Sequence, residues 1–102
     1  MKPYTSSDVM EAIKNIFPKH IKDVEEIIFE YGKENHEKEE NRVRLAVLKL
    51  SNGDLDGLIQ FIDLAKQDYR DVLLRAEYDT NGNEVDNPYN KILGNFKKKS
   101  KI

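Results

Sequence analysis

The fold is decided by residues 42–54, which read RVRLAVLKLSNGD. At about 100° of rotation per residue, a helix here places Leu45 and Leu48 roughly opposite a stripe formed by the other apolar residues. That stripe consists of Val43, Ala46, Val47 and Leu50. A helix with two apolar faces needs contacts on two sides. We therefore expect this helix to lie at the centre of the monomer or to be shared with a partner.

Helical spacing of apolar residues continues on both sides of this stretch, and no segment shows the clean alternation of a strand. Asn52-Gly53 supplies a helix stop, and Asp54 is placed to cap the helix that follows. The sequence therefore predicts an all-α fold with no sheet, a compact bundle of five helices plus a short C-terminal helix. The expected helices cover residues 8–17, 19–31, 35–51, 55–66, 68–78 and 87–93.

Several of the expected helix ends carry capping signals. Asp8 and Glu11 have the spacing of a capping box for the first helix. Gly32 stands just past the second helix, where a left-handed residue is favoured. Asn35 is a suitable N-cap for the third helix, with Glu37 in its first turns.

The length and composition fit one domain with one modest core. The chain has 102 residues, of which 38% are hydrophobic and 35% charged, and it contains no cysteine. No apolar run approaches a membrane span, and the N-terminus lacks the pattern of a secretory signal. We expect a soluble cytoplasmic protein with a single helical domain over residues 1–93 and a flexible Lys-rich tail over 94–102.

The charge is distributed unevenly along the chain, whose net charge is −2. Acidic residues exceed basic ones up to residue 90, whereas residues 91–102 contain lysines and no acidic residue. A solubilising end is the more frequent meaning of such a tail. The alternative is electrostatic binding of RNA, DNA or an anionic membrane, and binding to nucleic acid is expected to weaken steeply with salt. The tail lysines that would carry it are Lys97, Lys98, Lys99 and Lys101.

Two segments contain residue types that occur as metal ligands. From Asp79 onward the chain resembles the first half of a calcium-binding loop, but Glu84 replaces the required glycine and Asn90 replaces the bidentate glutamate. His36 and Glu40 share one helical face, yet two ligands do not make a metal site. An Asn-Gly turn and an acidic helix start are the simpler interpretations. We predict no metal and no cofactor, and we place the lone His20 at the surface.

Catalysis has little support in the sequence. The densest polar cluster is Asp68-Tyr69-Arg70-Asp71, in which two carboxylates are paired and Arg70 or the nearby Arg75 is placed to hold an anion. The simpler interpretation makes Asp68 a helix cap and pairs Asp71 with Arg75 one turn later. We predict that the chain is not an enzyme, and we keep a small-ligand or enzymatic pocket near Tyr69, Arg70 and Arg75 as a third hypothesis.

The leading hypothesis is a protein–protein interaction or accessory module, with self-association as a homodimer included. It rests on apolar residues beyond the main stripes, and the candidate partner surface consists of Leu45, Leu48 and Leu74. The patterning equally allows these leucines to complete a layered monomer core. The alternative function is an electrostatic nucleic-acid accessory protein that uses the Lys-rich tail.

Residues 42–79 also carry a resemblance. Three features are involved: the opening NRVRLA, the turn L-K-L-S-x-G-D-L and the closing A-x-x-D-Y-R-D-V-L. Together they resemble a family of small all-helical bacterial proteins of unknown function. The resemblance covers about a third of the chain and implies a helical fold. It implies no activity, ligand or catalytic residue.

Overall fold

The computed structural model describes residues 4–77, which contain four helices and no strand. The helices are α1 (Ser6–Ile16), α2 (Ile21–Ile28), α3 (Glu40–Ser51) and α4 (Leu55–Glu77). Within this part of the chain the prediction of an all-helical fold is confirmed. Among residues 4–77 the sequence predicts five helices and the structure has four, because the last two predicted helices form the single bent helix α4. The expected short helix at 87–93 lies outside the described residues.

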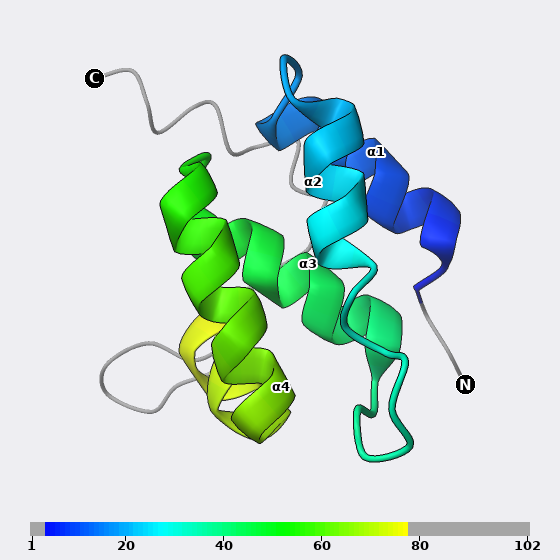
Figure 1. Ribbon diagram of the computed structural model, residues 1–102, viewed down its shortest axis with the longest axis vertical. Helices are drawn as coiled ribbons and strands as arrows, with labels where there is room; N and C mark the ends of the chain where they lie inside the picture. Colours follow the sequence, from blue (N-terminus) through cyan, green and yellow to red (C-terminus); the bar gives the residue numbers. More distant parts are fainter. Residues whose placement is uncertain (1–3, 78–102) are drawn as a thin grey trace.

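Helix α3 is the central element of the molecule. It packs on α4 along one side and on α1 along the other, while α2 contacts both α1 and α4. Figure 1 shows α3 crossing the middle of the molecule, between α4 and the pair formed by α1 and α2. The two apolar faces of residues 43–50 are therefore covered within one chain. Every residue from Val43 to Leu48 is buried.

One core joins all four helices. It is built almost wholly from aliphatic side chains and two aromatic ones, which is how a chain of this size fills a single interior. Its members are Val9, Ala12, Ile13, Ile16, Phe17, Val24, Ile28, Tyr31, Val43, Leu45, Ala46, Val47, Leu48, Leu58, Ile62, Ala65, Val72, Leu73 and Ala76.

The first helix begins earlier than the sequence predicts. Thr5 is the N-cap: its Oγ1 accepts a hydrogen bond from the Asp8 backbone N–H at 3.2 Å, and Asp8 Oδ2 accepts one from the Thr5 N–H at 3.0 Å. The capping box is thus formed by Thr5 and Asp8, in place of the expected pair Asp8 and Glu11. The expectation failed because both pairs have the same spacing, and spacing alone does not select between them.

The third helix begins later than predicted. Residues 35–39 form part of an irregular connection, and α3 starts at Glu40 after Glu39, whose φ of 54° is left-handed. The expected N-cap Asn35 is therefore a loop residue. Glu37, expected on the exposed surface of an early turn, is instead buried in this connection.

Helix α4 is bent where the sequence predicts a boundary between two helices. Asp68 has φ −157° and ψ 88°, which are not helical angles, so α4 consists of a first arm over 55–67 and a second arm over 69–77. Asp68 Oδ1 accepts a hydrogen bond from the Arg70 N–H at 3.2 Å, as an N-cap residue does. The expected helices 55–66 and 68–78 thus correspond to the two arms of α4.

The turn between α3 and α4 follows the sequence prediction. Asn52 and Gly53 both have positive φ, 55° and 78°, and end α3 in a left-handed conformation. Asp54 Oδ2 then accepts a hydrogen bond from the Gly57 N–H at 2.9 Å and caps the start of α4. This short connection sets α4 beside α3.

Candidate functional site

The three leucines predicted as a partner surface are separated by the fold. Leu45 and Leu48 are both 0% exposed and belong to the core, so their assignment to a surface is corrected. The physical reason is that α1 and α4 cover α3 from two sides. Leu74 is 56% exposed on the second arm of α4 and is the one of the three that lies at the surface.

Leu74 is surrounded by charged residues of both signs. Arg70 and Asp71 precede it by about one helical turn, and Arg75 follows it directly. Arg75 Nε donates a hydrogen bond to Asp71 Oδ2 at 3.3 Å, the predicted i, i+4 pair. The Leu74 side chain is therefore a single exposed apolar group on a surface that carries both positive and negative charges.

Ile59, on the first arm of α4, is a second exposed aliphatic residue. The sequence places Ile59 in the main stripe of its helix, but its side chain is 46% exposed, because the stripe is wider than the face that the neighbouring helices cover. Phe29 and Phe61, which lie off the main apolar stripes of the sequence, are partly buried and pack against the core. No pattern in the sequence separates these cases, since each depends on which edge of a helix is covered.

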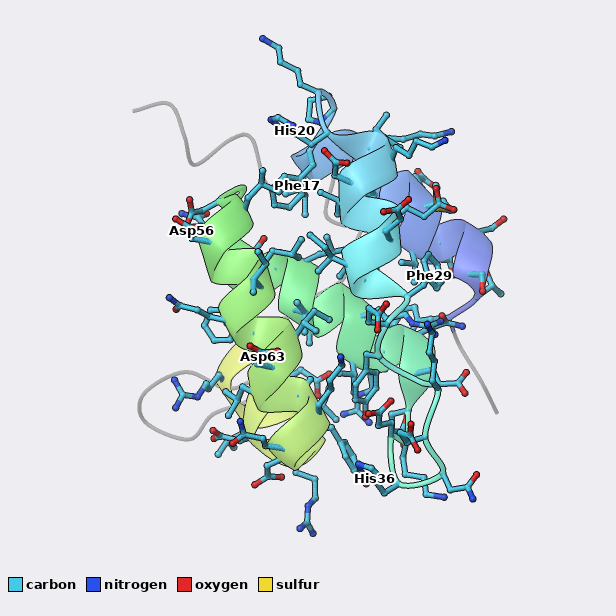
Figure 2. All side chains as sticks on the ribbon, viewed as in Figure 1. Phe17, His20, Phe29, His36, Asp56 and Asp63 are labelled. Carbon is cyan, nitrogen blue, oxygen red and sulfur yellow. The ribbon has the colours of Figure 1, made fainter. Side chains whose placement is uncertain are left out.

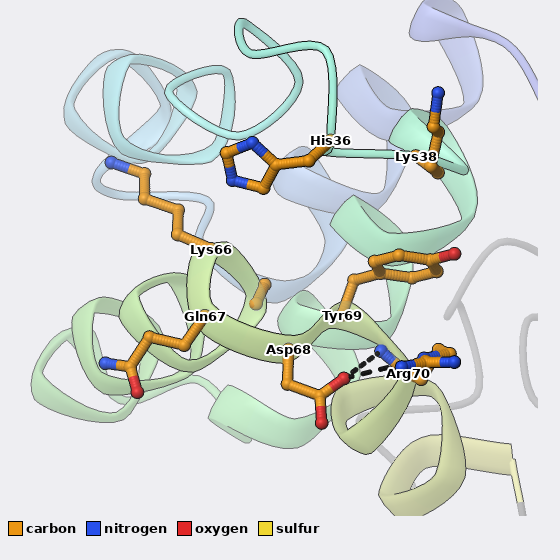
Figure 3. A pocket seen from close by; sticks show the side chains of 8 residues that line it. His36, Lys38, Lys66, Gln67, Asp68, Tyr69 and Arg70 are labelled. Carbon is orange, nitrogen blue, oxygen red and sulfur yellow. Dashed lines mark hydrogen bonds and ion pairs between the residues drawn. The ribbon is translucent and has the colours of Figure 1, made fainter.

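A pocket of about 340 Å³ lies between the bend in α4 and the segment that connects α2 to α3. Figure 3 shows His36 and Lys38 on the side of the connecting segment, and Lys66, Tyr69 and Arg70 on the side of α4. The pocket is lined by His36, Lys38, Ala65, Lys66, Gln67, Asp68, Tyr69 and Arg70. Two residues of the predicted ligand pocket, Tyr69 and Arg70, are present, whereas Arg75 does not line it and pairs with Asp71 instead.

The carboxylates of the predicted acid–base cluster have structural tasks. Asp68 caps the second arm of α4 and lies 3.8 Å from the Arg70 Nε, and Asp71 holds Arg75. These contacts are those of the simpler interpretation of the Asp68-Tyr69-Arg70-Asp71 cluster.

Glu37 organises the segment that borders the pocket. Its Oε1 accepts hydrogen bonds from three successive backbone N–H groups, those of Gly32 at 2.7 Å, Lys33 at 3.0 Å and Glu34 at 3.2 Å. The Glu37 residue is 6% exposed. Burial alone raises the pKa of this carboxyl, but the three N–H donors and the neighbouring His36 outweigh it, so its pKa lies below the ordinary value.

Arg44 fastens the other side of the same segment. Its guanidinium donates from Nε and Nη2 to the Tyr31 carbonyl, at 3.1 and 2.7 Å, and from Nη1 to Asn41 Oδ1 at 2.8 Å. It also stacks 4.4 Å from the centre of the Phe29 ring. Desolvation lowers the pKa of Arg44, because the side chain leaves water for this enclosed position.

Tyr31 completes this group of buried polar contacts. Its ring is fully buried, and its hydroxyl donates to the Lys38 carbonyl at 2.8 Å. Burial first, and then the Glu37 carboxylate, raise the pKa of Tyr31, so the hydroxyl keeps its proton and remains a donor. Sequence reasoning missed Tyr31, Glu37 and Arg44 as a unit, because their contacts join residues of the α2–α3 connection to one another and to α3.

The C-terminal end of α4 is tied to α3 by polar contacts as well. Arg42 donates through Nε and Nη2 to the two carboxylate oxygens of Glu77, the first at 2.8 Å. Lys49 Nζ donates to the Ala76 carbonyl at 2.7 Å. A bidentate arginine–carboxylate pair of this kind fixes geometry as well as charge. It holds the second arm of α4 against α3.

The histidines lie far apart. Figure 2 shows His20 and His36 at opposite ends of the molecule. His20 is exposed, as predicted, and His36 is in the connecting segment, so it does not share a helical face with Glu40. Among residues 4–77 no three histidine, aspartate or glutamate side chains are grouped as metal ligands. The calcium-like segment from Asp79 and the tail lysines lie outside the described residues.

None of the four described helices combines the length and the apolar character that crossing a membrane requires. In comparisons with protein-family models, curated proteins and solved structures, nothing matches this chain. The resemblance of residues 42–79 to a family of small bacterial helical proteins therefore stays a prediction.

Proposed function

We propose that the chain is a protein–protein interaction or accessory module, and that its second arm of α4 pairs with the same arm of a second copy. The observation that carries this proposal is Leu74, which is 56% exposed on the second arm of α4, whereas its neighbours Val72 and Leu73 are buried in the core. Binding energy in an interface concentrates on a few central side chains, and the residues around them exclude water.

The charges around Leu74 support a second copy as the occupant. In an interface with two-fold symmetry, every contact occurs twice: if a residue of the first copy contacts another residue of the second copy, the same two positions are also in contact with the copies exchanged. Asp71 and Arg75 lie one turn apart on either side of Leu74. Two such arms laid antiparallel bring Asp71 of each copy near Arg75 of the other, with the two leucines in contact at the axis. A surface of one sign would not offer this complementarity.

The association is expected to be weak. Full burial of one leucine side chain is worth about 1.5–3 kcal/mol, and exposed ion pairs add about 0–1 kcal/mol each. Sedimentation velocity or light scattering over a wide range of protein concentrations is the appropriate measurement. We expect the average mass to rise with concentration.

Matched substitutions test where the contact lies. Leu74→Asp is expected to abolish the rise in mass, whereas Ile59→Asp, which alters the other exposed aliphatic residue of the same helix, is expected to leave it unchanged. A parent chain that stays strictly monomeric at the highest concentration contradicts pairing with a second copy. Equal loss in both variants contradicts the assignment to Leu74.

The alternative function, electrostatic binding of nucleic acid, depends on Lys97, Lys98, Lys99 and Lys101. These residues lie outside the part of the chain that the structure describes, so this function stays a prediction from the sequence.

A further inference from the structure

The pocket at the bend of α4 exists because the helix is interrupted at Asp68. The non-helical angles of Asp68 turn the second arm away from the line of the first, and the segment carrying His36 and Lys38 lies across the opening. The pocket volume, about 340 Å³, is at the lower end of the range of small-molecule sites. A ligand of this pocket would therefore be small.

Basic side chains dominate the rim of this pocket. The lining includes four basic residues, which are His36, Lys38, Lys66 and Arg70. It includes only one acidic residue, Asp68. The Asp68 carboxylate is already engaged by the Arg70 N–H and lies 3.8 Å from the Arg70 Nε.

The excess of basic side chains distinguishes the pocket at the bend of α4 from the rest of the described residues. A second pocket, on the outer side of α2, is lined by Lys22, Glu25, Glu26, Phe29, Glu30 and Lys33, in which three acidic residues face two basic ones. The described residues as a whole also carry more acidic than basic side chains. At the rim of the pocket at the bend, basic residues therefore outnumber acidic ones, whereas the reverse holds for the described residues as a whole. This excess of positive charge favours an anionic ligand.

The basic groups are available to a ligand. Arg70 has 81% of its side chain exposed, and Lys66 meets Glu30 only at 3.8 Å in an exposed contact. Such exposed pairs contribute little and exchange readily. Figure 3 shows the basic side chains around the rim and not aimed at one point, so binding requires their ends to turn inward. Exposed side chains change rotamer on the picosecond to nanosecond timescale.

The wall of the pocket adds an apolar and aromatic surface. Ala65 is buried, and the partly buried Tyr69 ring packs against the core and forms one side. A ring or other flat apolar group of a ligand can rest on this surface while an anionic group meets the rim. We propose that the pocket between the bend of α4 and the α2–α3 segment binds a small phosphorylated molecule, with its phosphate among Lys38, Lys66 and Arg70.

The test is a titration of the full chain followed by amide chemical shifts. The probes are adenosine 5′-monophosphate, adenosine and inorganic phosphate, each added up to millimolar concentration at low salt. We expect the monophosphate to shift the amides of residues 36–38 and 65–70, inorganic phosphate to shift the same amides with lower affinity, and adenosine to shift none. No shift with the monophosphate, or equal shifts with adenosine, overturns the proposal.

A matched pair of double variants locates the binding. Lys66→Ala/Arg70→Ala removes two charges at the bend, and Lys22→Ala/Lys33→Ala removes two at the α2 pocket. We expect the first to weaken binding of the monophosphate at least about tenfold and the second to leave it near the parent value. Because all four side chains are on the surface, both variants should fold, which circular dichroism checks. Equal weakening in both variants overturns the site, since it would show a response to net charge alone.

Discussion

At the scale of single residues, the connection between α2 and α3 shows how a loop is held without regular structure. Three backbone N–H groups donate hydrogen bonds to one carboxylate oxygen of Glu37, and the Tyr31 carbonyl accepts hydrogen bonds from the Arg44 guanidinium. Buried backbone groups need such partners, because leaving one unsatisfied costs about 1–3 kcal/mol. The connection is therefore a fixed part of the fold.

Gly32 is required in this connection for two reasons. Its φ is +110°, and a Cβ atom there would lie 2.6 Å from the Arg44 Nη2. We expect Gly32→Ala to lower the free energy of unfolding by about 1–3 kcal/mol, measured by urea denaturation. Gly57→Ala is the control, since Gly57 is helical and its Cβ would come no closer than 3.3 Å to a neighbour. A cost for Gly32→Ala no larger than for Gly57→Ala would contradict this account.

The Glu37 carboxylate makes stability depend on acid. Its pKa is lowered in the fold relative to the ordinary value of 4.5, so its contribution is fully present above pH 4.5. As pH falls below that value through the folded pKa, the unfolded chain takes up the proton more readily and the contribution is lost. We expect the free energy of unfolding, measured by denaturation from pH 7 to pH 3, to fall at the acid end.

Glu37→Gln should remove a part of this acid dependence, because the amide does not titrate. Glu34→Gln, at an exposed glutamate of the same segment, should retain the acid dependence of the parent. If the two variants lose stability with acid equally, the assignment to Glu37 is wrong.

At the scale of elements, the sequence predicts most where local chemistry decides the outcome. The turn at Asn52 and Gly53, the cap at Asp54 and the boundary at Asp68 were all visible as residue types in sequence. The start of α3 was not, because the role of Glu37 depends on N–H groups three to five residues earlier in a folded loop. There, hydrogen bonds within the connection outweighed the helix signals of the sequence.

The cap at Asp68 should control the second arm of α4 separately from the first. Losing an N-cap side chain costs about 0.5–2 kcal/mol of helix stability. We expect Asp68→Ala to speed amide hydrogen exchange at residues 70–76 while residues 58–65 change little. Asp63→Ala, on the outer face of the first arm in Figure 2, is the control and should leave both arms near the parent rates. Uniform acceleration of both arms by Asp68→Ala would argue against a local capping role.

At the scale of the whole molecule, the candidate sites were predictable only in part. The sequence identifies Leu74, Tyr69 and Arg70 as candidates; Leu74 is exposed, and Tyr69 and Arg70 line the pocket at the bend of α4. Leu45 and Leu48 were equally plausible by pattern, and only the number of helices that pack on α3 assigns them to the core. His36 and Lys66 share the pocket with Tyr69 because of the bend, which brings distant parts of the chain together.

The Lys-rich tail yields a prediction that concerns the entire chain. If residues 97–101 bind nucleic acid by charge, affinity for single-stranded RNA or DNA should fall steeply with added salt, since each neutralised phosphate releases counterions. Truncation after Leu93 should abolish the binding, measured by fluorescence anisotropy at several salt concentrations. Binding that survives the truncation would assign it to another part of the molecule.

The enclosure of α3 has a consequence for how the protein tolerates change. Most helices at a protein surface tolerate substitutions periodically, because positions on the solvent-exposed face recur every three or four residues. Residues 43–48 have no solvent-exposed face, since each of them is buried. A saturation library over this chain should therefore show an unbroken intolerant block there, flanked by the ordinary rhythm in α2 and in the first arm of α4.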